Sequence, residues 1–208
     1  MNTRSYNNFS GIAAILAGIG VELYSIAFVI LASLRVAPNI GLPLSAILLL
    51  VDGLLTVIVF TALYLHVREM DSGFALLAIL FGAAGALASS AHGAFDLANV
   101  LYPPNPNVLE TSNYPSAIDP RGFATFGLTG LGLVVFGWLM LRGKMFPTRL
   151  AQLALLLGII SIVIYLARLI ILSPANPIVF IVIVVTGFII SPVFYVWLGI
   201  TLRRMGTG

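Results

Sequence analysis

Six apolar stretches follow one another along the chain, separated by shorter segments rich in proline, glycine and charged residues. Each stretch is longer than the roughly 20 residues that an α-helix needs to cross a bilayer. The breaks carry the residue types that form turns between helices. The pattern predicts an all-α fold with six transmembrane helices, at residues 9–34, 42–66, 73–101, 122–142, 148–172 and 177–202. The one long break, 102–121, contains five prolines and predicts an irregular loop.

Composition agrees with this pattern, since 60% of the residues are hydrophobic, only 8% are charged and the mean hydropathy is +1.11. Soluble domains usually carry about 25% charged residues. Residues 1–208 therefore form one predicted membrane domain whose main partner is the lipid bilayer. The first apolar stretch is too long for a signal peptide and contains Glu22, so we expect it to be retained as a helix.

Charge and cysteine content exclude several classes of protein. The net charge of +3 comes from basic residues at helix ends rather than from a basic cluster, so no nucleic-acid partner is predicted. The chain has no cysteine, which excludes disulfides, thiolate metal sites and cysteine nucleophiles.

Orientation follows from the distribution of basic residues over the predicted loops. With the N-terminus in the cytoplasm, the inner side carries seven of them: Arg4, Arg68, Arg142, Lys144, Arg149, Arg203 and Arg204. The outer side has Arg35 and Arg121, with Arg168 a short way inside the outer end of its helix. The positive-inside rule therefore predicts that both termini are cytoplasmic and that the loop 102–121 is outside.

Apart from residues at the inner helix ends, five ionisable residues fall within the predicted helices, where a charge at the centre costs about 2.5–3.5 kcal/mol on insertion scales. They are Glu22, Asp52, His92, Asp96 and Arg168. All five lie between the middle of the membrane and its outer surface, on four different helices. We expect them to form a polar cluster in the outer half, as candidates for binding a ligand or a proton. The alternatives are that they hydrogen-bond within the bundle as packing devices, or reach the outer surface as Arg168 and Asp96 are placed to do.

Helical spacing suggests which way these side chains face. In the third helix, Ala84, Ala88, His92 and Asp96 form one stripe, and Gly85, Ser89 and Gly93 form the next. We expect His92 to hydrogen-bond Asp96 one turn away and to face the bundle interior, near Glu22 or Asp52. In the last helix, Pro192 removes a backbone hydrogen bond and predicts a kink.

Known membrane chemistries narrow the function further. Retinal needs a lysine inside a helix, and Lys144 lies in a predicted loop. His66 and His92 lie at opposite sides of the membrane, which argues against haem ligation by two histidines, and no cofactor is predicted. One intramembrane histidine does not make a three-histidine zinc site. A carboxylate-rich metal site built from Glu22, Asp52, His92 and Asp96 stays open, although the spacing does not specify one.

One stretch, "LLLVDGLLTVIVFTALYLHVREMDSGFALLAILFGAAGALASSAHGAFDLAN", resembles the middle of small bacterial six-helix integral membrane proteins grouped as a domain of unknown function. It covers about a quarter of the chain. The resemblance implies a multi-pass protein of the bacterial inner (plasma) membrane. It carries no activity, so no functional residues follow from it.

Three functional hypotheses follow from these residues. The first is a small carrier or receptor with an outward-facing polar pocket for a small molecule or cation, in which Glu22 and Asp52 respond to protons or cations. The second is a membrane-embedded enzyme that uses His92 with Asp96, with or without a metal. The third is a non-catalytic partner subunit whose polar residues only fix helix packing. We favour the first, because the polar residues are spread over four helices.

Overall fold

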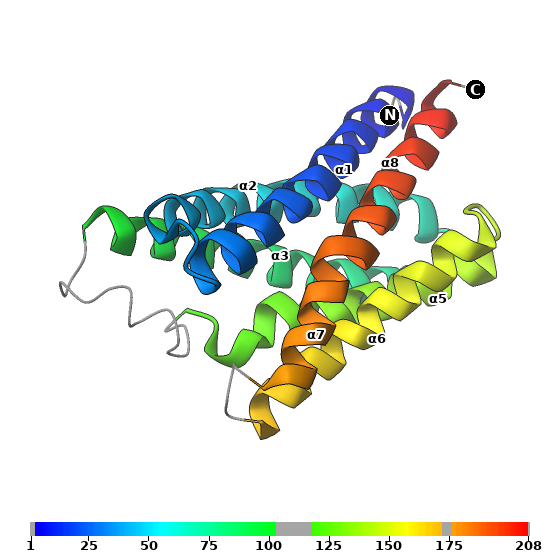
Figure 1. The fold of residues 1–208 in the computed structure, drawn as a ribbon. Coiled ribbons are helices and arrows are strands. Elements are labelled where there is room, and N and C mark those ends of the chain that lie inside the picture. Colours follow the sequence, from blue (N-terminus) through cyan, green and yellow to red (C-terminus); the bar gives the residue numbers. More distant parts are fainter. Residues whose placement is uncertain (1–2, 103–117, 172–175, 208) are drawn as a thin grey trace.

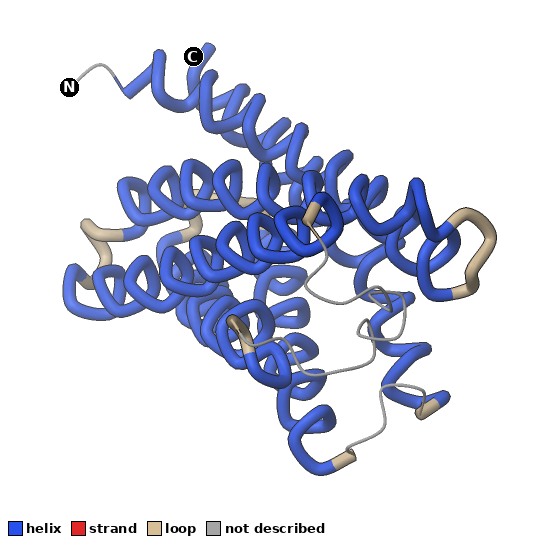
Figure 2. Tube along the Cα trace, turned by 90° about the vertical axis from the view of Figure 1, so that its left-hand side faces the viewer, coloured by secondary structure: helices blue, strands red, loops and turns tan. Residues whose placement is uncertain are grey.

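In the computed structural model, the chain is a bundle of long helices (Figure 1). The structure describes residues 3–102, 118–171 and 176–207. Throughout these ranges the ordered elements are helical (Figure 2). Six of the helical spans are long and apolar enough to cross a membrane: Arg4–Ser33, Pro38–Val67, Ser72–Leu101, Pro120–Gly143, Thr148–Ile170 and Pro177–Gly206. The predicted number of helices that are long and apolar enough to span a membrane is therefore confirmed.

The six spans are made of both α-helical and irregular segments. The α-helices are α1 (Thr3–Ser25), α2 (Pro38–Val67), α3 (Ser72–Leu101), α5 (Thr129–Gly143), α6 (Thr148–Ile170), α7 (Pro177–Val185) and α8 (Ser191–Thr207). Three π-helical segments interrupt or extend them: η1 (Ile26–Ser33), η3 (Phe123–Leu128) and η4 (Thr186–Ile190). A short 3₁₀ turn, η2 (Pro120–Gly122), precedes η3. Residues 103–117 of the predicted outer loop lie outside the described residues.

Most helix boundaries agree with the sequence pattern to within two residues, but α2 begins at Pro38 rather than near residue 42 and α8 ends at Thr207 rather than near residue 202. The largest difference is at the N-terminus, where α1 begins at Thr3 rather than near residue 9. The extra turns are polar, and they are held by contacts with other helices. The Asn7 side chain pairs with His66 of α2 at 3.0 Å, and the Tyr6 hydroxyl donates to the Ile58 carbonyl at 3.1 Å. Because tertiary contacts satisfy these polar groups, the helix extends beyond its apolar stretch.

The helices alternate in direction, so that the two ends of the bundle are distinct (Figure 1). One end, called the termini end below, holds both chain termini with the α2–α3 and α5–α6 turns. A Cβ at Gly206 would lie 2.8 Å from the Asn8 side-chain oxygen, and one at Gly143 would lie 3.1 Å from Met70. The other end, called the far end, holds the end of η1, the end of α3 and the start of η2. Because the number of alternating spans is even, both termini lie at the same end.

Small residues let neighbouring helices approach closely. A Cβ at Gly199 of α8 would lie 2.5 Å from the carbonyl oxygen of Gly11 in α1. A Cβ at Gly93 of α3 would lie 2.5 Å from the backbone nitrogen of Leu50 in α2. Contacts of this kind replace the hydrophobic driving force that lipid does not supply between membrane helices.

The packed core lies in the half of the bundle nearer the termini. Among its largest fully buried side chains are eight from four helices, α2, α5, α6 and α8: Phe60, Leu63, Phe136, Leu139, Leu150, Phe194, Leu198 and Leu202. The rings of Phe60 and Phe136 pack with their centroids 5.6 Å apart. This half is therefore closed by large apolar side chains, while the five predicted ionisable residues, Glu22, Asp52, His92, Asp96 and Arg168, lie beyond it.

The outer faces of the helices are apolar. Leu80 and Ile181 are both 59% exposed, and many other large aliphatic side chains are similarly exposed. A soluble protein rarely exposes apolar side chains on this scale. The exterior thus has the chemistry of a surface that contacts hydrocarbon.

The last span leaves α-helical geometry at Thr186–Ile190, directly before Pro192. Proline has no N–H to donate to the preceding turn, so an irregular segment is expected there. A π-helical segment thus ends two residues before Pro192, and the predicted kink itself stays a prediction. The segments η1 and η3 lack an internal proline, and the sequence pattern did not indicate them.

Candidate functional site

Asp52 is the most enclosed of the five predicted ionisable residues. It lies in α2 and its side chain is buried, with only 7% exposed. It packs against Gly20 of α1, where a Cβ would overlap the carboxylate. Within the described ranges, no hydrogen bond or ion pair to this carboxylate is present. A buried carboxylate without such a partner is costly, and it is the kind of group that takes up a proton or a cation.

Tyr24 of α1 connects Asp52 to two other predicted residues. Its hydroxyl lies within electrostatic range of Asp52 of α2, Asp96 of α3 and Arg168 of α6. These four residues, Tyr24, Asp52, Asp96 and Arg168, are called the polar cluster below. Three of the predicted residues, Asp52 of α2, Asp96 of α3 and Arg168 of α6, are thus related through one tyrosine. That they form one site for a ligand or a proton stays a prediction.

A fifth helix approaches the polar cluster through Tyr195 of α8. This side chain is 6% exposed, and its hydroxyl lies beside Thr56 and within electrostatic range of Asp52. Thr56 is also buried, one turn along α2 from Asp52. Two tyrosine hydroxyls, from α1 and α8, thus lie near the same carboxylate.

Arg168, near the end of α6, is half-buried and packs against the residues that begin the fourth span. Its guanidinium would be 2.9 Å from a Cβ at Gly122 and lies over the Phe126 ring at 5.7 Å. It is also within electrostatic range of Asp119 and Arg121. Arg168 therefore connects the polar cluster to the residues that begin the fourth span.

Asp119 organises the start of that span. It is 3% exposed, and its two carboxylate oxygens accept from the backbone nitrogens of Ala124 at 2.8 Å and Thr125 at 2.9 Å. The chain turns there through two residues in the left-handed region, Arg121 (φ 59°) and Gly122 (φ 77°). A buried carboxylate that accepts two N–H groups fixes this turn against the beginning of η3.

His92 and Asp96 form the predicted pair within α3. The Nε2 atom of His92 lies 3.2 Å from Oδ2 of Asp96, and the two side chains are 24% and 45% exposed. The prediction that the stripe through Ala84 faces the interior is wrong, because Ala84 is exposed and the buried face runs through Gly85, Ser89 and Gly93.

The reason lies in the glycines and serines themselves. Ser90 donates to the Leu50 carbonyl at 2.9 Å, and Gly93 approaches the backbone of α2, so the face with the smallest side chains is the packed one. In the described part of the chain, His92 makes no hydrogen bond or ion pair with Glu22 or Asp52. The pair therefore lies at the edge of the bundle, and Asp96 is its link to Tyr24.

Glu22 is half-buried in α1 and, in the portion of the chain that the structure describes, makes no hydrogen bond or ion pair. Across the same portion, no three histidine or acidic side chains come together in a group suited to a metal ion. The candidates Glu22, Asp52, His92 and Asp96 are thus not assembled as one donor set in this conformation.

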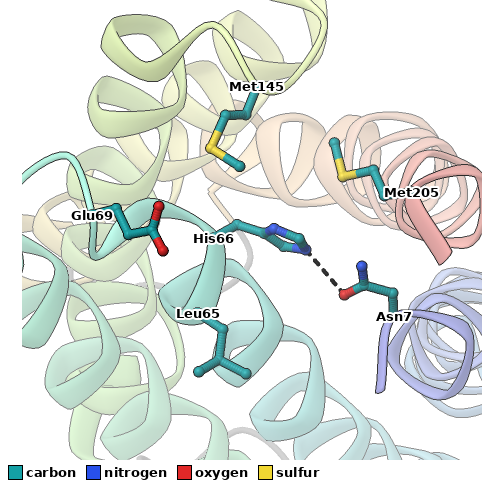
Figure 3. A pocket seen from close by; sticks show the side chains of 6 residues that line it. All are labelled: Asn7, Leu65, His66, Glu69, Met145 and Met205. Atoms are coloured by element: carbon teal, nitrogen blue, oxygen red, sulfur yellow. Dashed lines mark hydrogen bonds between the residues drawn. The ribbon is translucent and has the colours of Figure 1, made fainter. Parts of the chain in front are cut away.

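A separate pocket opens at the termini end (Figure 3). It has a volume of about 500 Å³ and is lined by Asn7, Leu65, His66, Glu69, Met145 and Met205. These residues come from α1, the end of α2, the α5–α6 turn and α8. The ring of His66 also packs edge-on against Phe146, with centroids 5.7 Å apart. From the sequence, His66 is predicted only to lie at the side of the membrane opposite to His92.

Several members of these sites were therefore not predicted. The hydrophobic pattern places Tyr24 and Tyr195 in predicted apolar helices and Asp119 in the predicted loop 102–121. Helical spacing offers a partial signal for Tyr195, which follows Gly187 and Ser191 on one face of the last span. The pocket at the termini end joins residues far apart in sequence, and no local spacing signals it.

Comparisons with protein-family models, with curated proteins and with solved structures find no match to this chain. The resemblance to bacterial six-helix membrane proteins thus stays a prediction from the sequence.

Proposed function

We propose that the chain is a multi-pass membrane protein that acts as a small carrier or receptor, with Asp52 as the group that responds to a proton or a cation. Insertion in a membrane is supported by the six apolar spans and by the exposed aliphatic side chains around them. In the hydrocarbon region the backbone polar groups are satisfied within helices, as a membrane requires.

The termini end is proposed to face the cytoplasm of a bacterial cell, across the inner (plasma) membrane. The seven basic residues Arg4, Arg68, Arg142, Lys144, Arg149, Arg203 and Arg204 belong to the segments at this end. The positive-inside rule then orients the termini inward and the polar cluster toward the outside. The assignment to a bacterial membrane is based only on the sequence resemblance described above.

The single observation that carries the functional proposal is the environment of Asp52. A carboxylate with 7% exposure lies next to Gly20, without a hydrogen bond in the described part of the chain. The hydroxyls of Tyr24 and Tyr195, from two other helices, lie within electrostatic range of this carboxylate. Ionisable residues inside membrane proteins commonly mark a path or a binding site for ions or protons.

The distribution of packing supports an outward-facing arrangement. Fully buried aromatic and aliphatic side chains fill the half of the bundle nearer the termini, from Val59 to Val67 in α2. Asp52 is seven residues from Val59, about 10 Å along the helix at 1.5 Å per residue. An aqueous ligand would therefore reach Asp52 from the far end, because large apolar side chains close the other side.

The three π-helical segments η1, η3 and η4 all belong to spans that pack around this half. Segments of this kind are frequent at functional sites. Their position fits a region that changes shape when a ligand or proton binds.

Thermal unfolding of the purified protein tests the proposal. Melting temperatures are measured over a range of pH and of Na⁺ and K⁺ concentrations for the wild type, for Asp52→Asn and for Asp96→Asn. We expect a stabilisation by protons or cations that Asp52→Asn abolishes and that the half-exposed Asp96→Asn leaves largely in place. Equal responses in all three proteins would leave the packing-subunit hypothesis as the better one.

The second candidate is an enzyme that uses the His92–Asp96 pair, and the 3.2 Å contact favours it. A carboxylate that orients a histidine is a common device in general acid–base catalysis. Metal analysis of the purified protein separates the two functions. Stoichiometric zinc or manganese that is lost in His92→Ala would support the enzyme.

A further inference from the structure

The pocket at the termini end contains soft donor atoms from three parts of the chain. Two of its lining residues are methionines, Met145 in the α5–α6 turn and Met205 in α8, and a third is His66 at the end of α2. In Figure 3 the side chains of Met145 and Met205 extend into the same space as the His66 ring. Methionine side chains are flexible enough to close around a small ligand.

The hydrogen bond to Asn7 sets the state of the imidazole. The Nε2 atom of His66 lies 3.0 Å from Oδ1 of Asn7, and a carbonyl oxygen accepts only, so Nε2 donates. In a neutral ring the other nitrogen, Nδ1, then keeps its lone pair. Over the described ranges, no other residue hydrogen-bonds this ring. Histidines that bind metals typically donate their other ring N–H to a neighbouring residue, and this hydrogen bond fixes the tautomer.

The chemistry of the remaining lining residues limits the ligand. The pocket offers two thioether sulfurs, one imidazole nitrogen and one carboxylate, Glu69, and none of its lining residues is lysine or arginine. Thioether ligands favour Cu(I) over the harder divalent metals, and imidazole also suits copper. A single carboxylate beside the pocket balances one positive charge.

We propose that this pocket binds a soft monovalent metal ion of the Cu(I) and Ag(I) class through Met145, Met205 and the Nδ1 atom of His66. Asn7 holds the imidazole in the tautomer that leaves Nδ1 available, and Glu69 supplies the compensating charge. The site lies at the opposite end of the bundle from the polar cluster, so it is independent of the proposed function of Asp52.

Titration of the purified full-length chain with Ag(I) tests this inference. Silver nitrate in chloride-free buffer avoids both precipitation and redox chemistry, and calorimetry reports affinity and stoichiometry. We expect a single tight site in the wild type. The variants Met145→Leu, Met205→Leu and His66→Asn should each weaken it by about tenfold or more, as loss of a ligand or of its support does in metal sites.

Two matched variants serve as controls. Met70→Leu removes a thioether near the same end, beside Gly143 but outside the lining of the pocket, and His92→Asn removes the other histidine. Both should bind Ag(I) as the wild type does. Methionine to leucine conserves side-chain volume, so these variants are expected to fold.

X-ray absorption at the copper edge gives a readout that needs no variant. The protein is loaded with Cu(I) under anaerobic conditions, and the expected spectrum shows both sulfur and nitrogen scatterers. The inference is overturned if the wild type binds no stoichiometric Ag(I), if the double variant Met145→Leu with Met205→Leu binds it as tightly as the wild type, or if the bound copper has no sulfur neighbour.

Discussion

The carboxylate of Asp52 occupies the space that a side chain at Gly20 would need. A Cβ at residue 20 would overlap Oδ1 of Asp52 and lie 2.7 Å from its carboxyl carbon. The absence of a side chain in α1 therefore permits a buried acidic group in α2. Sequence position alone does not relate these two residues, which lie on separate predicted helices.

Replacing Gly20 with alanine should destabilise the protein, because α1 must shift or the carboxylate must rotate away. We expect a loss of about 1–3 kcal/mol in the free energy of unfolding, typical of overpacking. The measurement is chemical or thermal unfolding in detergent. Gly73→Ala is the matched control, since its Cβ would approach no atom closer than 3.6 Å.

The double variant Gly20→Ala with Asp52→Ala isolates the contact between the two residues. Removing the carboxylate creates room for the added methyl group, so Gly20→Ala should cost much less in the Asp52→Ala background than in the wild type. Equal costs in the two backgrounds would show that the methyl group clashes with something else.

Asp119→Ala should lower stability by about 2 kcal/mol, because the buried carboxylate accepts two backbone N–H groups at the start of the fourth span. Asp71→Ala provides the comparison, since Asp71 accepts only one exposed backbone N–H, from Phe74 at 3.2 Å. Its cost should be about 0.5 kcal/mol, at the low end for helix caps. A smaller effect for Asp119 than for Asp71 would contradict this account of the turn.

The His92–Asp96 pair should contribute little to stability. Both side chains are partly exposed, and pairs four residues apart on a helix stabilise it by about 0.5 kcal/mol or less. A double-mutant cycle with His92→Ala and Asp96→Ala measures the coupling directly. A coupling of several kcal/mol would instead show that the pair is shielded from water, and it would support the hypothesis of an enzyme that uses His92 and Asp96.

Orientation is testable because the chain has no cysteine of its own. Single cysteines are introduced at Tyr102, which is 83% exposed at the far end, and at Ser72, which is exposed at the termini end. In intact cells, a membrane-impermeant maleimide should label Tyr102→Cys and should label Ser72→Cys only after permeabilisation. The reverse pattern would invert the proposed topology.

Much of the architecture follows from the sequence because span length and turn composition are local properties. The six apolar stretches predict the six spans that are long and apolar enough to cross a membrane. The early start of α1 was not predicted, because Asn7 is satisfied by His66 on another helix. A tertiary contact of this kind leaves no local trace in the sequence.

The candidate site was predictable to a smaller extent. Asp52, Asp96 and Arg168 stand out as costly groups in apolar helices, and they do lie around one tyrosine. The predicted orientation of α3 was wrong, because the stripe of alanines and the stripe of glycines and serines differ little in hydropathy. Only close packing against α2 distinguishes the two stripes. Tyr24 joins the cluster through its hydroxyl, whereas the hydrophobic pattern counts it as an apolar residue.

The central claim is that Asp52 changes its protonation or binds a cation under conditions that the protein meets in a membrane. Infrared difference spectroscopy of the reconstituted protein, recorded while pH or Na⁺ concentration is stepped, detects a single carboxyl group through its carbonyl stretch. The account predicts a carboxyl difference band that disappears in Asp52→Asn and persists in Asp96→Asn. A difference spectrum of Asp52→Asn that is indistinguishable from that of the wild type would contradict it.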